Sequence, residues 1–157
     1  MKKLLLLFTA VLICFTVGCG KTTNKVVDID GDSIIFTATS SVLEIDDDTT
    51  LGNYLVALKD AGELTFEGNT GDFGLYITSM NGKANEIISS ALNSSEGYSW
   101  TVYIDFLDID GTPYAGDSET VTYGEKTLYK ASYGVSYIPC LEGHTYAFVY
   151  EYYNFSW

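Results

Sequence analysis

The stretch YSWTVYIDFL, residues 98–107, places large apolar side chains at every second position. One face of such a strand would carry Trp100, Val102, Ile104 and Phe106, and the other Thr101, Tyr103, Asp105 and Leu107. Because side chains alternate between the two faces of a strand, this period of two is typical of a strand with a buried face. We therefore expect a fold built on a sheet that contains residues 98–107.

A helix is expected upstream of this strand, from about Leu51 to Ala61. Its apolar side chains have the spacing of one helical face: Leu51, Tyr54, Leu55 and Leu58. Thr49 or Thr50 can cap the first turn, and the aspartates at 46–48 lie where the helix dipole favours negative charge. Gly62 is a typical residue at a helix end.

The remaining sequence indicates short strands separated by turns. Strands are expected over residues 33–39, 64–67, 74–80, 119–123, 126–132 and 145–153, with turns at 68–71, 81–82, 110–113 and around Gly124. Residues 85–97 fit either one helical turn or a loop. One helix packed on a mainly antiparallel sheet is an α+β fold, and a helix crossing one face of that sheet would be β-grasp-like.

The first residues have the parts of a secretory signal: two lysines, a short apolar run and the small residue Gly18. Cys19 follows directly and resembles the lipidated cysteine of a bacterial lipobox. This resemblance implies a lipoprotein signal peptide over residues 1–18, the lipidated Cys19 with a tether over 19–32, and one domain over 33–157. It places the domain at the extracellular face of a cell membrane. A simple secreted protein is the alternative, and a membrane-spanning anchor is disfavoured by the short apolar run.

The chain is strongly acidic. Its 157 residues contain 21 Asp and Glu, 8 Lys and no arginine, which gives a net charge of −13. Nucleic-acid binding is excluded on this composition, because neutralising phosphates requires basic side chains. Anionic ligands would also be repelled. We expect neutral or cationic partners, or an acidity that only keeps an exported domain in solution.

Catalysis is not expected. His144 is the single histidine, and its neighbours are typical of a turn before a strand. Cys140 is the one free thiol left once Cys14 is removed with the signal and Cys19 is acylated. Its apolar surroundings predict a buried, inert thiol.

Three stretches together resemble a known family. They read TTLGNYL at 49–55, GLYITSMNG at 74–82 and YSWTVY at 98–103. In this order they are similar to the DUF4430 family, which is similar to the C-terminal β-grasp-like domain of the vitamin B12 carriers transcobalamin and intrinsic factor. The resemblance covers about residues 46–152 and implies a β-grasp-like fold. In those carriers a separate helical domain holds most of the ligand, so corrinoid (cobalamin-like) binding by this module is an analogy.

The candidate ligand-binding residues lie on or beside these motifs: Tyr76, Tyr98, Trp100 and Tyr103. Tyrosine offers broad apolar contact with a polar tip at little entropy cost, which suits binding surfaces. The alternative is that Trp100 and one tyrosine face are simply core. Capture of a corrinoid or a related small neutral ligand for a membrane importer would need an aromatic cluster facing a groove. A surface module that contacts a protein or a wall polymer would instead show a flat, tyrosine-rich face.

Two acidic clusters have part of the spacing of a calcium loop. Asp108, Asp110 and Glu119 fit the acidic positions, but Pro113 stands where the loop needs glycine. The cluster at residues 28–32 fits only the start of such a loop. Aspartate also favours turns, so we expect acidic turns rather than bound calcium.

Overall fold

The computed structural model of the protein describes residues 27–157. The predicted signal peptide, Cys19 and the tether up to residue 26 lie outside the described residues. The helix of the described part is α1 (Leu51–Asp60). The strands are β1 (Val27–Asp30), β2 (Ser33–Thr37), β3 (Phe66–Gly71), β4 (Gly74–Met80), β5 (Lys83–Ala84), β6 (Glu86–Ala91), β7 (Ser94–Ile104), β8 (Asp108–Ile109), β9 (Thr112–Pro113), β10 (Ala115–Tyr123), β11 (Lys126–Ala131) and β12 (Thr145–Ser156).

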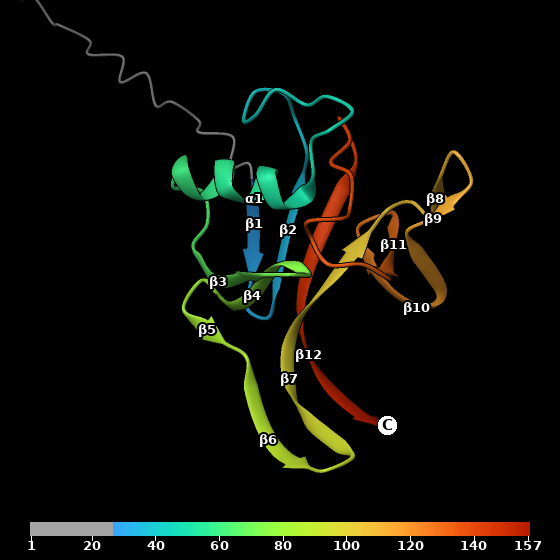
Figure 1. Cartoon of the computed structure of the whole chain (residues 1–157). Helices are drawn as coiled ribbons and strands as arrows, with labels where there is room; N and C mark the ends of the chain where they lie inside the picture. The colour runs from blue at the N-terminus through green and yellow to red at the C-terminus, as the bar shows by residue number, and fades with distance from the viewer. Residues whose placement is uncertain (1–26) are drawn as a thin grey trace, which may run out of the picture.

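Seven strands form the main sheet, and every pairing in it is antiparallel (Figure 1). Six of them follow the order β1-β2-β12-β7-β11-β10, and β6 pairs with the first part of β7. Two small sheets, β3-β4-β5 and β8-β9, complete the fold. A mostly antiparallel sheet with one short helix is consistent with the expected α+β class.

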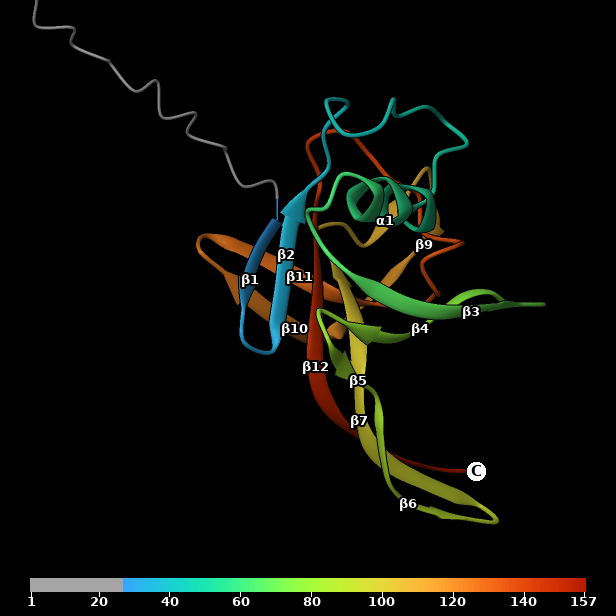
Figure 2. The ribbon, with the colours of Figure 1, turned by 90° about the vertical axis from the view of Figure 1, so that its left-hand side faces the viewer.

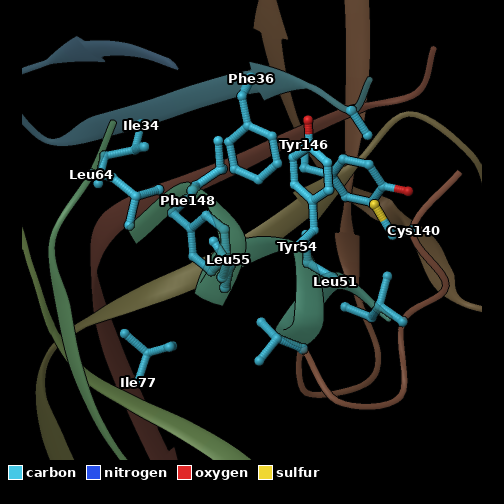
Figure 3. Packing of buried hydrophobic residues seen from close by; sticks show 14 of the residues in the cluster. Ile34, Phe36, Leu51, Tyr54, Leu55, Leu64, Ile77, Cys140, Tyr146 and Phe148 are labelled. Carbon is cyan, nitrogen blue, oxygen red and sulfur yellow. The ribbon is translucent and has the colours of Figure 1, made fainter. Parts of the chain in front are cut away.

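The predicted helix is confirmed, together with its cap. The Thr50 side chain accepts a hydrogen bond from the Asn53 backbone, and the Asn53 side chain accepts one from the Thr50 backbone. The predicted apolar face is fully buried: Leu51, Tyr54, Leu55 and Leu58. It packs on one face of the main sheet, where Phe36 lies between the rings of Tyr54, Tyr146 and Phe148 (Figure 3).

A second, smaller core lies on the opposite face of the sheet. Its buried members are Ile35, Tyr103, Leu128 and Ala147. Figure 2 shows α1 on one side of the sheet and the β10–β11 hairpin on the other. The Tyr123 hydroxyl of β10 donates a hydrogen bond to Asp28 of β1, so the two outermost strands of the sheet come together. Both faces of the central strands are therefore covered near Tyr103.

The structure corrects the expected elements at three places. Residues 68–71 are not a turn, because they belong to β3, and the turn follows Gly71. Residues 85–97 are neither a helical turn nor a loop, because they form β6 and the start of β7. Both segments are largely exposed on both faces, so their sequence lacks the alternation that reveals a half-buried strand. The central strand starts at Ser94 and ends at Ile104, rather than spanning 98–107.

The folded domain also begins earlier than residue 33. β1 lies within the segment interpreted as a tether, and it pairs with β2 from Val27 opposite Phe36 to Asp30 opposite Ser33. Its sequence, VDID, alternates apolar and polar residues but covers only four positions, and aspartate is depleted in strands. Across residues 27–157 the structure contains no helix with the length and apolar character needed to cross a membrane.

Candidate aromatic binding surface

A three-stranded ribbon projects from the body of the domain and carries most of the candidate surface. It consists of β6, the first part of β7 and the last part of β12, and we call residues 86–98 and 150–157 the arm (Figures 1 and 2). β7 is its middle strand, with Tyr98 opposite Tyr152 on β12 and opposite Glu86 on β6. The arm extends the main sheet beyond the core that α1 covers.

A ladder of aromatic rings runs from the core onto the arm. The Trp100 ring lies 5.3 Å from that of Tyr150, and Tyr150 stacks on Tyr98 at 5.6 Å with an angle of 11° between the rings. Tyr98 in turn meets Tyr152 edge to face at 5.6 Å. Offset-stacked and edge-to-face pairs at these separations are favourable. Because strand residues two apart share a face, the alternating pattern of β7 and β12 builds this ladder directly.

The segment at Lys83–Asn85 fixes the base of the ladder. Trp100 donates its indole N–H to the Lys83 carbonyl at 2.9 Å and its backbone N–H to the Asn85 side chain at 3.2 Å. The Tyr150 hydroxyl donates to the Ala84 carbonyl at 2.9 Å. The Lys83 ammonium lies 3.9 Å from the centre of the Tyr150 ring, which is a cation–π contact.

The four predicted residues are placed very differently. Trp100 and Tyr103 are buried, at 9% and 3% exposure, whereas Tyr76 and Tyr98 are exposed at 62% and 37%. Tyr76 and Trp100 line one cleft of about 260 Å³ together with Tyr133. Tyr98 does not line this cleft. Its ring is connected to that of Trp100 through Tyr150, on which it stacks. Tyr103 lies on the opposite face of the sheet, so the structure brings two of the four residues together.

Tyr103 belongs to a charged network on its own face. Its hydroxyl donates to Glu151 at 2.8 Å, and Lys130 lies 3.3 Å from Glu151 and 2.8 Å from Glu119. Burial, and then the hydrogen bond to the Glu151 carboxylate, raise the pKa of Tyr103 well above its ordinary value. These contacts link β7, β11 and β12 on the face of the sheet that carries the second core.

The acidic residues with part of the spacing of a calcium loop are not brought together. Asp108 and Asp110 lie in the exposed β8–β9 hairpin, whereas Glu119 lies on β10 and pairs with Lys130. Asp32, from the other acidic cluster, lies in the β1–β2 turn and pairs with Lys83. Across residues 27–157, no three acidic, histidine or cysteine side chains form a group that would hold a metal ion.

Cys140 is buried, and His144 has a carboxylate partner. Cys140 is buried as predicted, and burial raises the pKa of its thiol to about 12. His144 lies 2.7 Å from Asp105, and the same carboxylate accepts the Thr145 backbone N–H at 2.9 Å. This contact closes the turn ahead of β12, where the sequence predicted a turn.

The hollows of the described surface are shallow and open. A hollow of about 500 Å³ lies on the face away from α1, between β2 and the β10–β11 turn. A hollow of about 430 Å³ lies beside α1, and one of about 410 Å³ lies between Tyr76 and the arm. These volumes fall in the lower part of the range of about 300–1,000 Å³ that is typical of small-molecule sites, and the Tyr76–Trp100 cleft falls below it.

Sequence reasoning missed much of the aromatic surface, including Tyr133, Tyr150, Tyr152, Phe155 and Trp157. The sequence does indicate part of this aromatic surface, because Tyr146, Phe148, Tyr150 and Tyr152 alternate along one predicted strand. What the sequence lacked was the pairing of that strand with residues 94–104.

No protein-family model, no curated protein and no solved structure matches this chain. The resemblance to the DUF4430 family stays a prediction.

Proposed function

We propose that this protein is a non-catalytic, lipid-anchored binding module at the extracellular face of a cell membrane, and that its arm binds a neutral polysaccharide of the cell wall. The lipid anchor is the expectation drawn from Cys19 and the signal before it. A β-grasp-like arrangement is part of the proposal, supported by the packing of α1 across one face of the sheet.

The observation that carries the proposal is the exposure of the arm. Large apolar side chains that stand in solvent gather there: Ile87, Ile88, Leu92, Tyr98, Tyr152, Phe155 and Trp157. Leu92, at the turn between β6 and β7, is 89% exposed, and Trp157 is 67% exposed. Tyr98 and Tyr152 lie on the ladder face of the arm, and Phe155 and Trp157 lie on the opposite face. Exposed apolar groups that lie together mark an interaction surface.

The chemistry of the ladder suits a sugar polymer. Aromatic rings pack against the apolar faces of sugar rings, while hydroxyl and carboxylate groups exchange hydrogen bonds with sugar hydroxyls. The arm supplies both, because the exposed Tyr152 donates to Glu96 at 2.6 Å beside the Tyr98 ring. The net charge of −13 favours an uncharged partner over an anionic one.

The test is co-sedimentation of residues 20–157 with chitin, an insoluble neutral polysaccharide. The wild type is expected to enter the pellet, and the double variant Tyr98→Ala/Tyr152→Ala to lose most of this binding. Tyr137→Ala is the matched control, because Tyr137 is also exposed but lies outside the arm. A wild type that stays in the supernatant, or a double variant that pellets like the wild type, would contradict the proposal.

Corrinoid capture is the second candidate, because Tyr76 and Trp100 line one cleft. A corrinoid would lie largely outside a cleft of about 260 Å³, so this candidate ranks below the polymer. Titration of tryptophan fluorescence with cobalamin and cobinamide separates the two. Saturable quenching that Tyr76→Ala removes would favour the corrinoid.

A further inference from the structure

One edge of the arm is free. β12 pairs with β2 only as far as Val149, opposite Ser33, and beyond this point it has β7 on one side and no other strand of residues 27–157 on the other (Figures 1 and 2). The Tyr150 backbone N–H donates to Asp32 on the β2 side at 2.7 Å, whereas the Trp157 N–H donates to Asn93 on the β7 side at 3.0 Å. Backbone groups alternate in direction along a strand. Residues 152, 154 and 156 therefore point their N–H and C=O groups outward.

This edge lacks the features that protect exposed strands. Natural edge strands are blunted by lysine, proline or a β-bulge. The other edge of the arm, β6, has such an irregularity between Ile87 and Ser89. β12 pairs with β7 without a register shift from Tyr146 to Ser156, and the sequence YEYYNFS at 150–156 contains neither lysine nor proline. The free edge of β12 is therefore a regular template for one more antiparallel strand.

We propose that this edge binds the same edge of a second copy of the chain, with a two-fold axis at Asn154. In this register Asn154 faces Asn154 of the partner subunit, and Tyr152 faces Ser156 of the partner subunit. All three outward residues of each copy then exchange backbone hydrogen bonds. The two arms join into one continuous sheet, which is β-strand addition between identical partners.

The charge pattern of this edge is compatible with a second copy and with this register. A two-fold contact must be complementary to itself, and no side chain from Tyr152 to Trp157 is charged. Glu151, the nearest acid on β12, is already paired with Lys130. A register centred one residue earlier, on Tyr153, would need the Tyr150 N–H, which Asp32 already accepts.

On the face of the arm opposite the ladder, the same register joins two rows of aromatic rings. Tyr153 stacks on Phe155 at 5.3 Å, and Phe155 lies 5.4 Å from Trp157. With the axis at Asn154, Tyr153 of each copy lies directly across from Phe155 of the partner subunit. Facing aromatic side chains stabilise an antiparallel pair.

Sedimentation equilibrium of residues 20–157 tests the proposal, because this segment retains the whole described core. The average mass of the wild type is expected to rise from the monomer mass toward twice that value as the concentration is raised to about 100 µM, which reveals a dissociation constant as weak as that value. Because each copy is strongly acidic, salt should strengthen the dimer by screening repulsion between the copies. A wild type that stays monomeric over this range, with or without added salt, would overturn the proposal.

Charge exchange at Asn154 tests the register itself. Asn154→Lys and Asn154→Glu each place like charges opposite one another, so each variant alone is expected to be monomeric. An equal mixture of the two should restore the dimer, because position 154 faces itself. Ser90→Lys, on the exposed β6 edge, is the matched control and should remain dimeric. A dimer of Asn154→Lys alone, or a mixture that stays monomeric, would exclude this interface.

The inference is independent of polysaccharide binding. Tyr98→Ala removes a ring of the ladder on β7, away from the free edge of β12, so it should weaken pelleting and leave the dimer intact. The two results are separable, because sedimentation equilibrium is run without polysaccharide.

Discussion

Trp100 shows how one residue can join a core to a surface. Its ring is buried and its indole N–H is bound to Lys83, yet its neighbours in the ladder lead out into solvent. Trp100→Ala is expected to lower the free energy of unfolding by about 3–5 kcal/mol, the usual cost of deleting a buried tryptophan ring. Urea denaturation followed by circular dichroism measures this change.

The exposed Trp157 is the control for that variant. Trp157→Ala should change the free energy of unfolding by about 0.5 kcal/mol or less, as is usual for surface positions. A Trp100→Ala protein that unfolds at the wild-type urea concentration would show that Trp100 is not part of the core.

At the scale of one element, α1 owes its start to Thr50. The paired hydrogen bonds between Thr50 and Asn53 satisfy backbone groups that a helix end otherwise leaves free. Thr50→Ala removes the accepting hydroxyl and should cost about 1 kcal/mol of unfolding free energy.

Thr50→Ser keeps the hydroxyl oxygen and is the matched variant, so it should remain close to the wild type in the same urea measurement. If Thr50→Ala and Thr50→Ser unfold alike, the cap does not stabilise the helix.

For the whole molecule, buried tyrosines predict a loss of stability at alkaline pH. Burial raises the pKa values of Tyr54, Tyr103 and Tyr146 above the ordinary value of 10.0, and that of Cys140 from 9.0 to about 12. The unfolded chain therefore loses these protons at lower pH than the folded protein. The resulting stabilisation is fully present below the ordinary pKa values and is lost as the pH rises through the folded ones.

Urea midpoints measured over a series of increasing pH test this expectation. The midpoint should fall progressively once the pH exceeds about 9–10. Tyr103→Phe removes one of the titrating groups, so its midpoint should fall less steeply. A wild-type midpoint that stays constant across this range would contradict the burial of these groups.

The sequence predicted those parts of the fold that depend on local signals. The cap and apolar face of α1 lie within a few residues of one another, and the alternation in residues 98–104 reflects burial on one face. β6 lacks that alternation because solvent reaches both of its faces. The position of β12 between β2 and β7 depends on pairings between distant residues, which no local pattern reveals.

The candidate site was also predicted only in part. Trp100 and Tyr76 were chosen for their ring chemistry, and they do meet in one cleft. The burial of Tyr103 escaped prediction because the β10–β11 hairpin, far along the chain, covers the second face of the sheet. The arm depends on strand structure in residues 85–97, which the sequence does not indicate.

The order of the strands also decides how the domain responds to a mechanical pull. Val27 and Tyr146 are both opposite Phe36, so the first described residue is level with the start of β12, and Trp157 lies at the far end of that strand. A force that draws Val27 and Trp157 apart runs parallel to the strands and loads the β1–β2 and β2–β12 ladders in shear. In shear the hydrogen bonds of a ladder share the load and must break together, whereas peeling breaks them one at a time. A protein held at its N-terminal end and pulled by its arm is therefore stretched along its mechanically strong direction.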